Sequence, residues 1–107
     1  MDITTVEMVS YRFKADVTPA QIEATFEGVN QLLNQQPGFY YRSMSCNEQG
    51  EWYDLAFWKN MDCAKAGGDA FMASAAGQAL VALIDNDTLV MHQMPVATEV
   101  SAEMAAA

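Results

Sequence analysis

Basic residues are scarce in this chain: five Lys and Arg stand against fourteen Asp and Glu, giving a net charge of −9. Such a charge repels phosphate backbones and anionic lipid headgroups, so nucleic acids and membrane surfaces are poor candidate partners. The longest strongly apolar run, residues 79–84, is far too short to span a bilayer. The N-terminal residues lack the basic and apolar stretches of a signal peptide. We therefore expect a cytoplasmic protein.

Histidine and cysteine are scarce as well. His92 is the only histidine, and Cys46 and Cys63 stand alone, without the paired spacing of a zinc or thioredoxin-like site. Two free thiols are the simplest interpretation, and a disulfide is the alternative. The chain also contains no phosphate loop, nucleophile elbow or dinucleotide-binding fingerprint. On these grounds we expect neither a metal ion nor a cofactor.

The order of the predicted elements indicates the fold. A chain of 107 residues forms a single domain. The hydrophobic pattern predicts strands at 5–13, 39–46, 51–58 and 88–96, a helix between Thr18 and Pro37, and a broken helical segment at 62–84. This βαββαβ order is typical of an α+β, ferredoxin-like fold with a four-stranded antiparallel sheet. We assign the domain to 1–96 and treat 97–107 as a C-terminal tail that is mobile or packs on a partner chain.

Short motifs mark several element ends. Thr18 and Gln21 can form a capping box at the start of the first helix. Asn60 or Asp62 can cap the second helical segment, and Ser74 can cap a further short helix within it. The Gly67-Gly68 pair inside that segment indicates close backbone approach, a bend, or space for another group.

The hairpin between the second and third strands leaves two registers open. A four-residue loop sets Ser43 opposite Asp54, whereas a three-residue loop with a bulge at Gly50 sets Met44 there. The second register brings Arg42 onto the same face as Asp54, because a shift of one residue moves every side chain to the other face.

Apolar residues occupy both faces of the first and third strands, although two helices can cover only one face of the sheet. A second copy of the chain would cover the other face. We therefore expect a homodimer that pairs sheet to sheet.

Several of these segments are similar to those of small dimeric α+β barrel proteins, the group that includes the antibiotic-biosynthesis-monooxygenase-like proteins. The resemblance rests on Pro37-Gly38-Phe39 at a strand entry, Trp52-Tyr53-Asp54 in the next strand with Trp58 closing it, and an Ala-rich helix with Phe71 and then Ser74. It implies a homodimer, and often a cavity between the sheet and the helices of each subunit. Some members oxidise aromatic compounds without a cofactor, and others degrade haem.

His92 and Asp54 are the candidate catalytic residues. An imidazole can act as a general base near neutral pH, and a carboxylate among aromatic residues needs a partner. Asp54 would either orient His92, which requires a shared face of the sheet, or form a structural ion pair or hydrogen bond with Arg12, Arg42 or a tyrosine. The residues expected to form the walls of a ligand site are Phe26, Trp58, Phe71 and Met72.

Two functions remain open at this point. The first is a cofactor-independent, monooxygenase-like enzyme that acts on a small aromatic compound. The second is a non-catalytic dimeric module that binds a small hydrophobic ligand. Both need a cavity, and only the first needs a group that removes a proton from the bound molecule.

Overall fold

The computed structural model describes residues 2–102, which form four strands and four helices. In chain order the elements are β1 (Thr5–Phe13), α1 (Pro19–Glu23), α2 (Phe26–Asn34), β2 (Phe39–Cys46), β3 (Trp52–Trp58), α3 (Met61–Ala73), α4 (Ala75–Leu83) and β4 (Ile84–Pro95).

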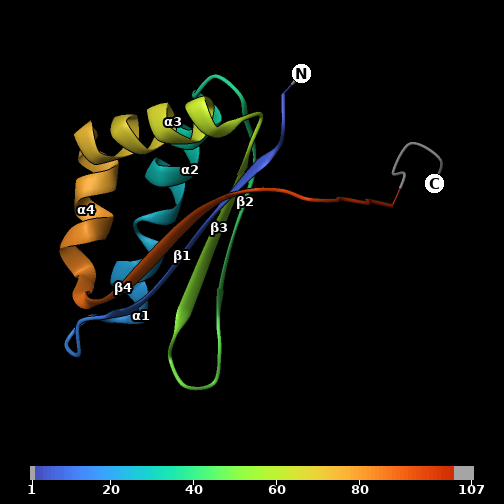
Figure 1. Ribbon diagram of the computed structural model, residues 1–107. Coiled ribbons are helices and arrows are strands. Elements are labelled where there is room, and N and C mark those ends of the chain that lie inside the picture. The colour runs from blue at the N-terminus through green and yellow to red at the C-terminus, as the bar shows by residue number, and fades with distance from the viewer. Residues whose placement is uncertain (1, 103–107) are drawn as a thin grey trace.

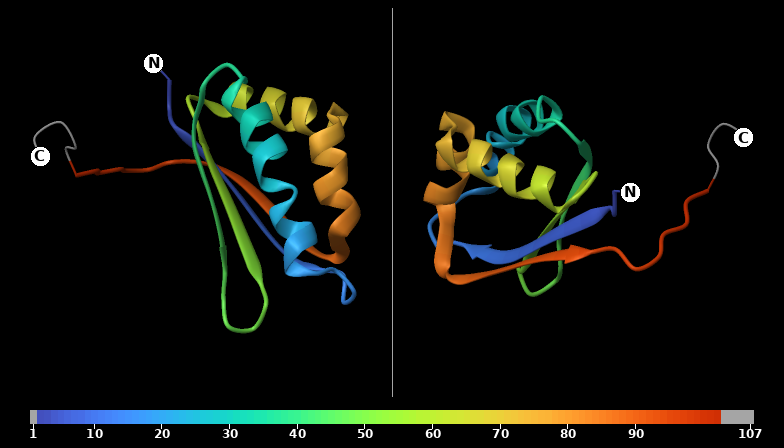
Figure 2. Two further views of the ribbon diagram at one scale, coloured as in Figure 1. Left: turned by 180° about the vertical axis from the view of Figure 1, so that it is seen from behind. Right: turned by 45° about the horizontal axis from the view of Figure 1, so that its top comes forward.

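The four strands form one antiparallel sheet in the order β2-β3-β1-β4. All four helices lie on one face of this sheet and leave the other face uncovered (Figure 1 and Figure 2). This is the ferredoxin-like α+β arrangement that the order of elements predicted, and the prediction is confirmed. β4 lies at an edge of the sheet, as Pro95 indicated.

The predicted helix caps are confirmed. Thr18 and Gln21 form the complete capping box of α1, and the Asn60 side chain accepts a hydrogen bond from the Cys63 amide at 2.8 Å. The expected single first helix is divided between α1 and α2. The Thr25 hydroxyl donates to the Ile22 carbonyl at 2.7 Å, a local bond that competes with regular helical pairing.

The β2–β3 hairpin adopts the register with a three-residue loop. Met44 lies opposite Asp54, and Asn47 and Glu51 close the loop through a 3.0 Å backbone hydrogen bond. Gly50 has a φ of +80°, a left-handed conformation that glycine adopts at little cost. Arg42 and Asp54 therefore share the helix-facing side of the sheet.

The second helical segment is broken at Ser74, as predicted, and its two glycines have different surroundings. Ser74 accepts a hydrogen bond from the Gly77 amide at 2.9 Å and so caps α4. A Cβ atom on Gly67 would overlap the indole ring of Trp58. A Cβ atom on Gly68 would meet only a carboxylate oxygen of Glu7, 4.0 Å away. The close approach of α3 to Trp58 therefore requires a glycine at position 67. At Gly68 there is room for a Cβ atom.

β4 begins earlier than the predicted start at Thr88. The pairing with β1 shifts between Ser10↔Val90 and Arg12↔Asp85, so extra residues of β4 bulge out of the ladder. The Thr88 hydroxyl holds this bulge: it accepts from the Arg12 amide at 2.9 Å and donates to the Asp85 carbonyl at 2.6 Å. Residues 85–87, which lie between the predicted helical segment and the predicted strand, are part of this irregular strand.

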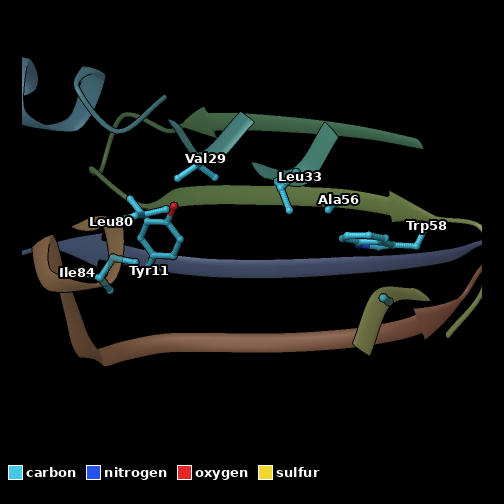
Figure 3. Packing of buried hydrophobic residues seen from close by; sticks show 8 residues of the cluster. Tyr11, Val29, Leu33, Ala56, Trp58, Leu80 and Ile84 are labelled. Carbon is cyan, nitrogen blue, oxygen red and sulfur yellow. The ribbon is translucent and has the colours of Figure 1, made fainter. Parts of the chain in front are cut away.

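The core lies between the helices and the sheet (Figure 3). Tyr11, Leu80 and Ile84 pack together at one end of the strands, and Trp58 lies at the other end with the small Ala56 beside it (Figure 3). Both aromatic side chains are buried. Val29 and Leu33 of α2 lie over the sheet between these two aromatic side chains (Figure 3).

The C-terminal segment 97–102 is exposed and carries no regular secondary structure, and it extends away from the sheet (Figure 1). The rest of the tail predicted at 97–107 lies outside the described residues, so its packing on a partner chain stays a prediction. None of the helices in the described part of the chain is long and apolar enough to cross a membrane.

Candidate functional site

A cavity of about 620 Å³ lies between the sheet and the helices, and we call it the helix-side cavity. Its floor comes from all four strands, with Arg42 contributed by β2, and its roof comes from α2, α3 and α4. Most lining residues are apolar. The polar or charged ones are Glu7, Tyr11, Arg42, Asp54, Lys65, Asp69, Asn86 and Gln93.

The mouth of the cavity lies between α3 and the edge strand β4. The lining residues that are exposed to solvent come from these two elements alone: Lys65, Asp69, Met72, Asn86, Leu89 and Met91. Large apolar side chains are among them, and Met72 and Met91 are each more than half exposed. Flexible thioethers at the mouth can adapt to ligands of different shapes.

A buried ion pair forms one end of the cavity. Arg42 donates from Nε to Asp54 Oδ1 at 2.8 Å and from Nη2 to Asp54 Oδ2 at 2.6 Å, and the Tyr11 hydroxyl donates to the same Oδ2 at 3.2 Å. Arg42 Nη1 also donates to Asn30 at 2.8 Å. Asp54 therefore forms the ion pair with Arg42 that one of its two interpretations expected, and a catalytic role for Asp54 stays a prediction.

Burial and charge in this group shift two pKa values. Burial, together with the negative charge of Asp54, raises the pKa of Tyr11 far above its ordinary range. Burial alone would lower the pKa of Arg42, but the hydrogen bonds and charge of Asp54 outweigh it and leave that pKa raised. Tyr11 therefore stays neutral and Arg42 stays charged at any physiological pH.

Glu7 is a second carboxyl group in the cavity, and its environment differs. It lies on β1 between Gln93 of β4 and Ala56 of β3. Gln93 Nε2 donates to Glu7 Oε2 at 2.8 Å, and the described residues include no cation in an ion pair with this carboxylate. Burial raises the pKa of Glu7; the Gln93 hydrogen bond opposes this rise, and the charge of Asp54 adds to it.

The indole N–H of Trp58 is the other polar group of interest. Trp58 is fully buried and lines the cavity, and its Nε1 is the one buried side-chain nitrogen or oxygen of the described residues that has no hydrogen-bond partner. Buried donors almost always have partners. The donor is closed off from solvent in this structure, so an acceptor on a bound molecule or a water reaches it only when the side chains around it move.

Three of the four predicted wall residues, Trp58, Phe71 and Met72, line the cavity. Phe26 does not, because it begins α2 at the break between the first two helices rather than continuing the apolar stripe of one long helix. Whether the three lining residues contact a ligand remains a prediction.

The alternative in which Asp54 orients His92 does not fit the structure, because the two side chains lie on opposite faces of the sheet. β1 pairs Val9 with Asp54 and Met8 with His92, and neighbouring residues of a strand point to opposite faces. His92 is therefore on the uncovered face, exposed, and it is not among the residues that line the cavity. A catalytic role for His92 stays a prediction without support from the cavity.

Glu7 was missed at the sequence level. It precedes Val9 and Tyr11 by two and four residues, so strict alternation along β1 places it on the same face as these apolar residues. A carboxylate at such a position is the signal that could have identified it.

The two cysteines, Cys46 and Cys63, are free thiols. Among the described residues, no group of three or more His, Cys, Asp and Glu side chains is arranged to hold a metal ion.

The fold and the cavity define a class of small ferredoxin-like α+β proteins. No protein-family profile matches the chain, and no curated protein is similar to it in sequence. Among solved structures it is similar to SnoaB, a cofactor-independent oxygenase from Streptomyces nogalater, with a TM-score of 0.71 and 16% identity over 92% of this chain and 97% of that one.

Two further structures share the fold. One is a dimeric ferredoxin-like protein of unknown function from Thermobifida fusca, with a TM-score of 0.72 and 16% identity over 88% of this chain and 92% of that one. The other is a provisionally named antibiotic biosynthesis monooxygenase from Caulobacter crescentus, with a TM-score of 0.72 and 18% identity over 91% of this chain and 92% of that one. The fold expected from the resemblance is confirmed.

Proposed function

We propose that the chain is a monooxygenase-like enzyme that uses no cofactor and acts on a small aromatic compound bound in the helix-side cavity. The observation that carries this proposal is the cavity itself. Its volume of about 620 Å³ and its apolar walls with a few convergent polar groups are typical of a site for one small molecule. The similarity in fold to a cofactor-independent oxygenase supports the reaction class.

The chemistry requires an acidic substrate. A phenol or enol loses a proton, and the electron-rich anion reacts directly with dioxygen in a site from which water is excluded. In the balanced reaction a CH₂ group and O₂ give a C=O group and water, so the substrate supplies all four electrons. The protein binds and orients the substrate and removes the proton.

The test combines binding with turnover. Phenols and enolisable aryl ketones, 2-naphthol and 2-tetralone among them, are titrated into ¹⁵N-labelled protein while the two indole N–H resonances are followed. Trp52→Phe assigns the remaining signal to Trp58. We expect the Trp58 signal to shift and an oxygen electrode to record uptake with at least one ketone. Binding without oxygen uptake would identify the non-catalytic binding module instead, and the absence of any shift would contradict both functions.

We also propose that the chain forms a homodimer through the uncovered sheet face. The side chains that alternate with the cavity-lining residues point to this face. Most of them are apolar or aromatic, namely Val6, Met8, Tyr41, Tyr53, Leu55, Phe57, Val90 and Met94, and the polar ones include Ser10, Ser43, Ser45 and His92. An apolar patch of this kind marks an interaction surface. The similar protein from Thermobifida fusca, which is described as dimeric, supports the same assembly.

Light scattering after size exclusion tests the dimer. We expect twice the 11.7 kDa of one chain. His92→Asp places a charge on the uncovered face and should yield monomers. Ala75→Asp introduces a carboxylate at the exposed first position of α4 and should leave the dimer intact. A monomeric mass for the unmodified chain would contradict the proposal.

A further inference from the structure

Six ionisable side chains line the helix-side cavity, and five of them are unsuited to accept a proton from a bound molecule. Asp54 and Arg42 are joined in the bidentate pair, and the Tyr11 hydroxyl keeps its proton and donates a hydrogen bond to Asp54. The other two, Lys65 and Asp69, are exposed at the mouth. Glu7 alone is a half-buried carboxyl group inside the cavity with no cation paired to it among the described residues.

The surroundings of Glu7 leave one of its oxygens available. Gln93 Nε2 donates to Oε2 at 2.8 Å, and no hydrogen bond to Oε1 occurs among the described residues. Gly68 of α3 faces this carboxylate, and a Cβ atom there would meet Oε2 at 4.0 Å, an ordinary van der Waals contact; Glu7 itself lines the cavity. A ligand can therefore approach Glu7 from the cavity.

Glu7 and Trp58 also lie close together in the wall of the cavity. Glu7 pairs with Ala56 across β1 and β3, and Trp58 follows two residues later on the same face, so the two side chains are diagonal neighbours. Such neighbours have Cα atoms roughly 7–8 Å apart, a separation that one or two aromatic rings can bridge.

We infer that Glu7 is the general base of the cavity and that Gln93 positions it, so the substrate carries a phenolic or enolic O–H group. This inference rests on the proposed function and deepens it. In the step, the substrate O–H bond breaks and an O–H bond to Glu7 forms, while the electron pair stays on the substrate oxygen and delocalises into the ring. A half-buried carboxylate without a cation is a stronger base than an exposed one, which suits this transfer.

The experiment compares two probes that differ in one group. 2-Naphthol can donate an O–H to Glu7, whereas 2-methoxynaphthalene has the same ring system and no such donor. Both are titrated into the intact protein at a series of pH values, with the Trp58 indole resonance as the reporter. We expect tighter binding of 2-naphthol, and we expect this preference to disappear as the pH falls and Glu7 becomes protonated.

Three variants test whether the preference for 2-naphthol depends on the Glu7 carboxylate. Glu7→Gln replaces a charged acceptor by a neutral one of the same shape and should reduce the preference for 2-naphthol about tenfold and remove its pH dependence. Glu23→Gln makes the same chemical change on the exposed surface of α1 and should change nothing. If Glu7→Gln does not fold, Gln93→Met serves instead: the loss of its hydrogen bond should move the midpoint of the pH dependence upward.

The outcomes distinguish this inference from the proposed function. If both probes bind equally well and Glu7→Gln is neutral, the inference is overturned, and the cavity remains a ligand site. If neither probe shifts the Trp58 resonance, the proposed function fails together with the inference.

Discussion

The buried pair of Arg42 and Asp54 predicts a large loss of stability when one partner is removed. In Asp54→Ala, Arg42 loses two short hydrogen bonds and Tyr11 loses one, and the Arg42 side chain is only 7% exposed in the intact protein. Leaving such a charge buried costs about 3–5 kcal/mol. A domain of this size has a total stability of about 5–15 kcal/mol, so a loss of about 3–5 kcal/mol is at least about a fifth of it. With an m-value of about 2 kcal/mol/M, the urea midpoint falls by about 2 M.

Equilibrium urea unfolding followed by circular dichroism measures this loss. Asp2→Asn breaks the pair between Asp2 and Lys59, which is 3.5 Å long with both side chains about half exposed, and should leave the midpoint unchanged. Arg42→Met combined with Asp54→Leu removes both charges and should recover most of the stability. The reasoning is refuted if Asp54→Ala costs less than about 1 kcal/mol, the range of exposed pairs.

Two further predictions concern the roof and floor of the cavity. Gly67→Ala should destabilise the protein by about 1–3 kcal/mol, because the new methyl group overlaps the Trp58 ring. The neighbouring Gly68→Ala should be neutral or should stabilise the protein by up to about 1 kcal/mol. Thermal unfolding measures both variants, and equal shifts in melting temperature would contradict the structure. Burial raises the pKa of Glu7 above its ordinary value of 4.5, so the folded state keeps the proton to higher pH than the unfolded chain does. The free energy of unfolding should therefore fall as the pH rises from about 4.5 through the pKa of Glu7 in the folded state. Urea unfolding at a series of pH values should show a smaller fall for Glu7→Gln. Identical pH profiles for the two proteins would contradict a raised pKa of Glu7.

The sequence predicted the elements whose signals are local. The capping box of Thr18 and Gln21 and the new cap at Ser74 depend on residues within one turn, and both are observed. The hairpin sequence with Gly50 left two candidate registers, and the one that sets Met44 opposite Asp54 is observed. Helix caps and tight turns are determined by residues that are close together in the chain, so their geometry can be predicted from the sequence.

The positions of the site residues depend on how strands that are distant in the chain pair with one another. Local sequence patterns do not determine that pairing. The face of His92 is determined by its pairing with Met8, and the bulge held by Thr88 separates that pairing from the one at the start of β4. The difference between Gly67 and Gly68 depends on the position of Trp58, on another element. Among the lining residues that sequence patterns did not identify, Glu7 could have been found from the alternation along β1.

A crystal structure of the protein with 2-naphthol bound would test the central claim most directly. The account predicts that the ring system lies in the helix-side cavity against Trp58, with its hydroxyl group within hydrogen-bond distance of Glu7. An empty cavity at saturating ligand, or a ligand on the uncovered sheet face beside His92, would contradict it.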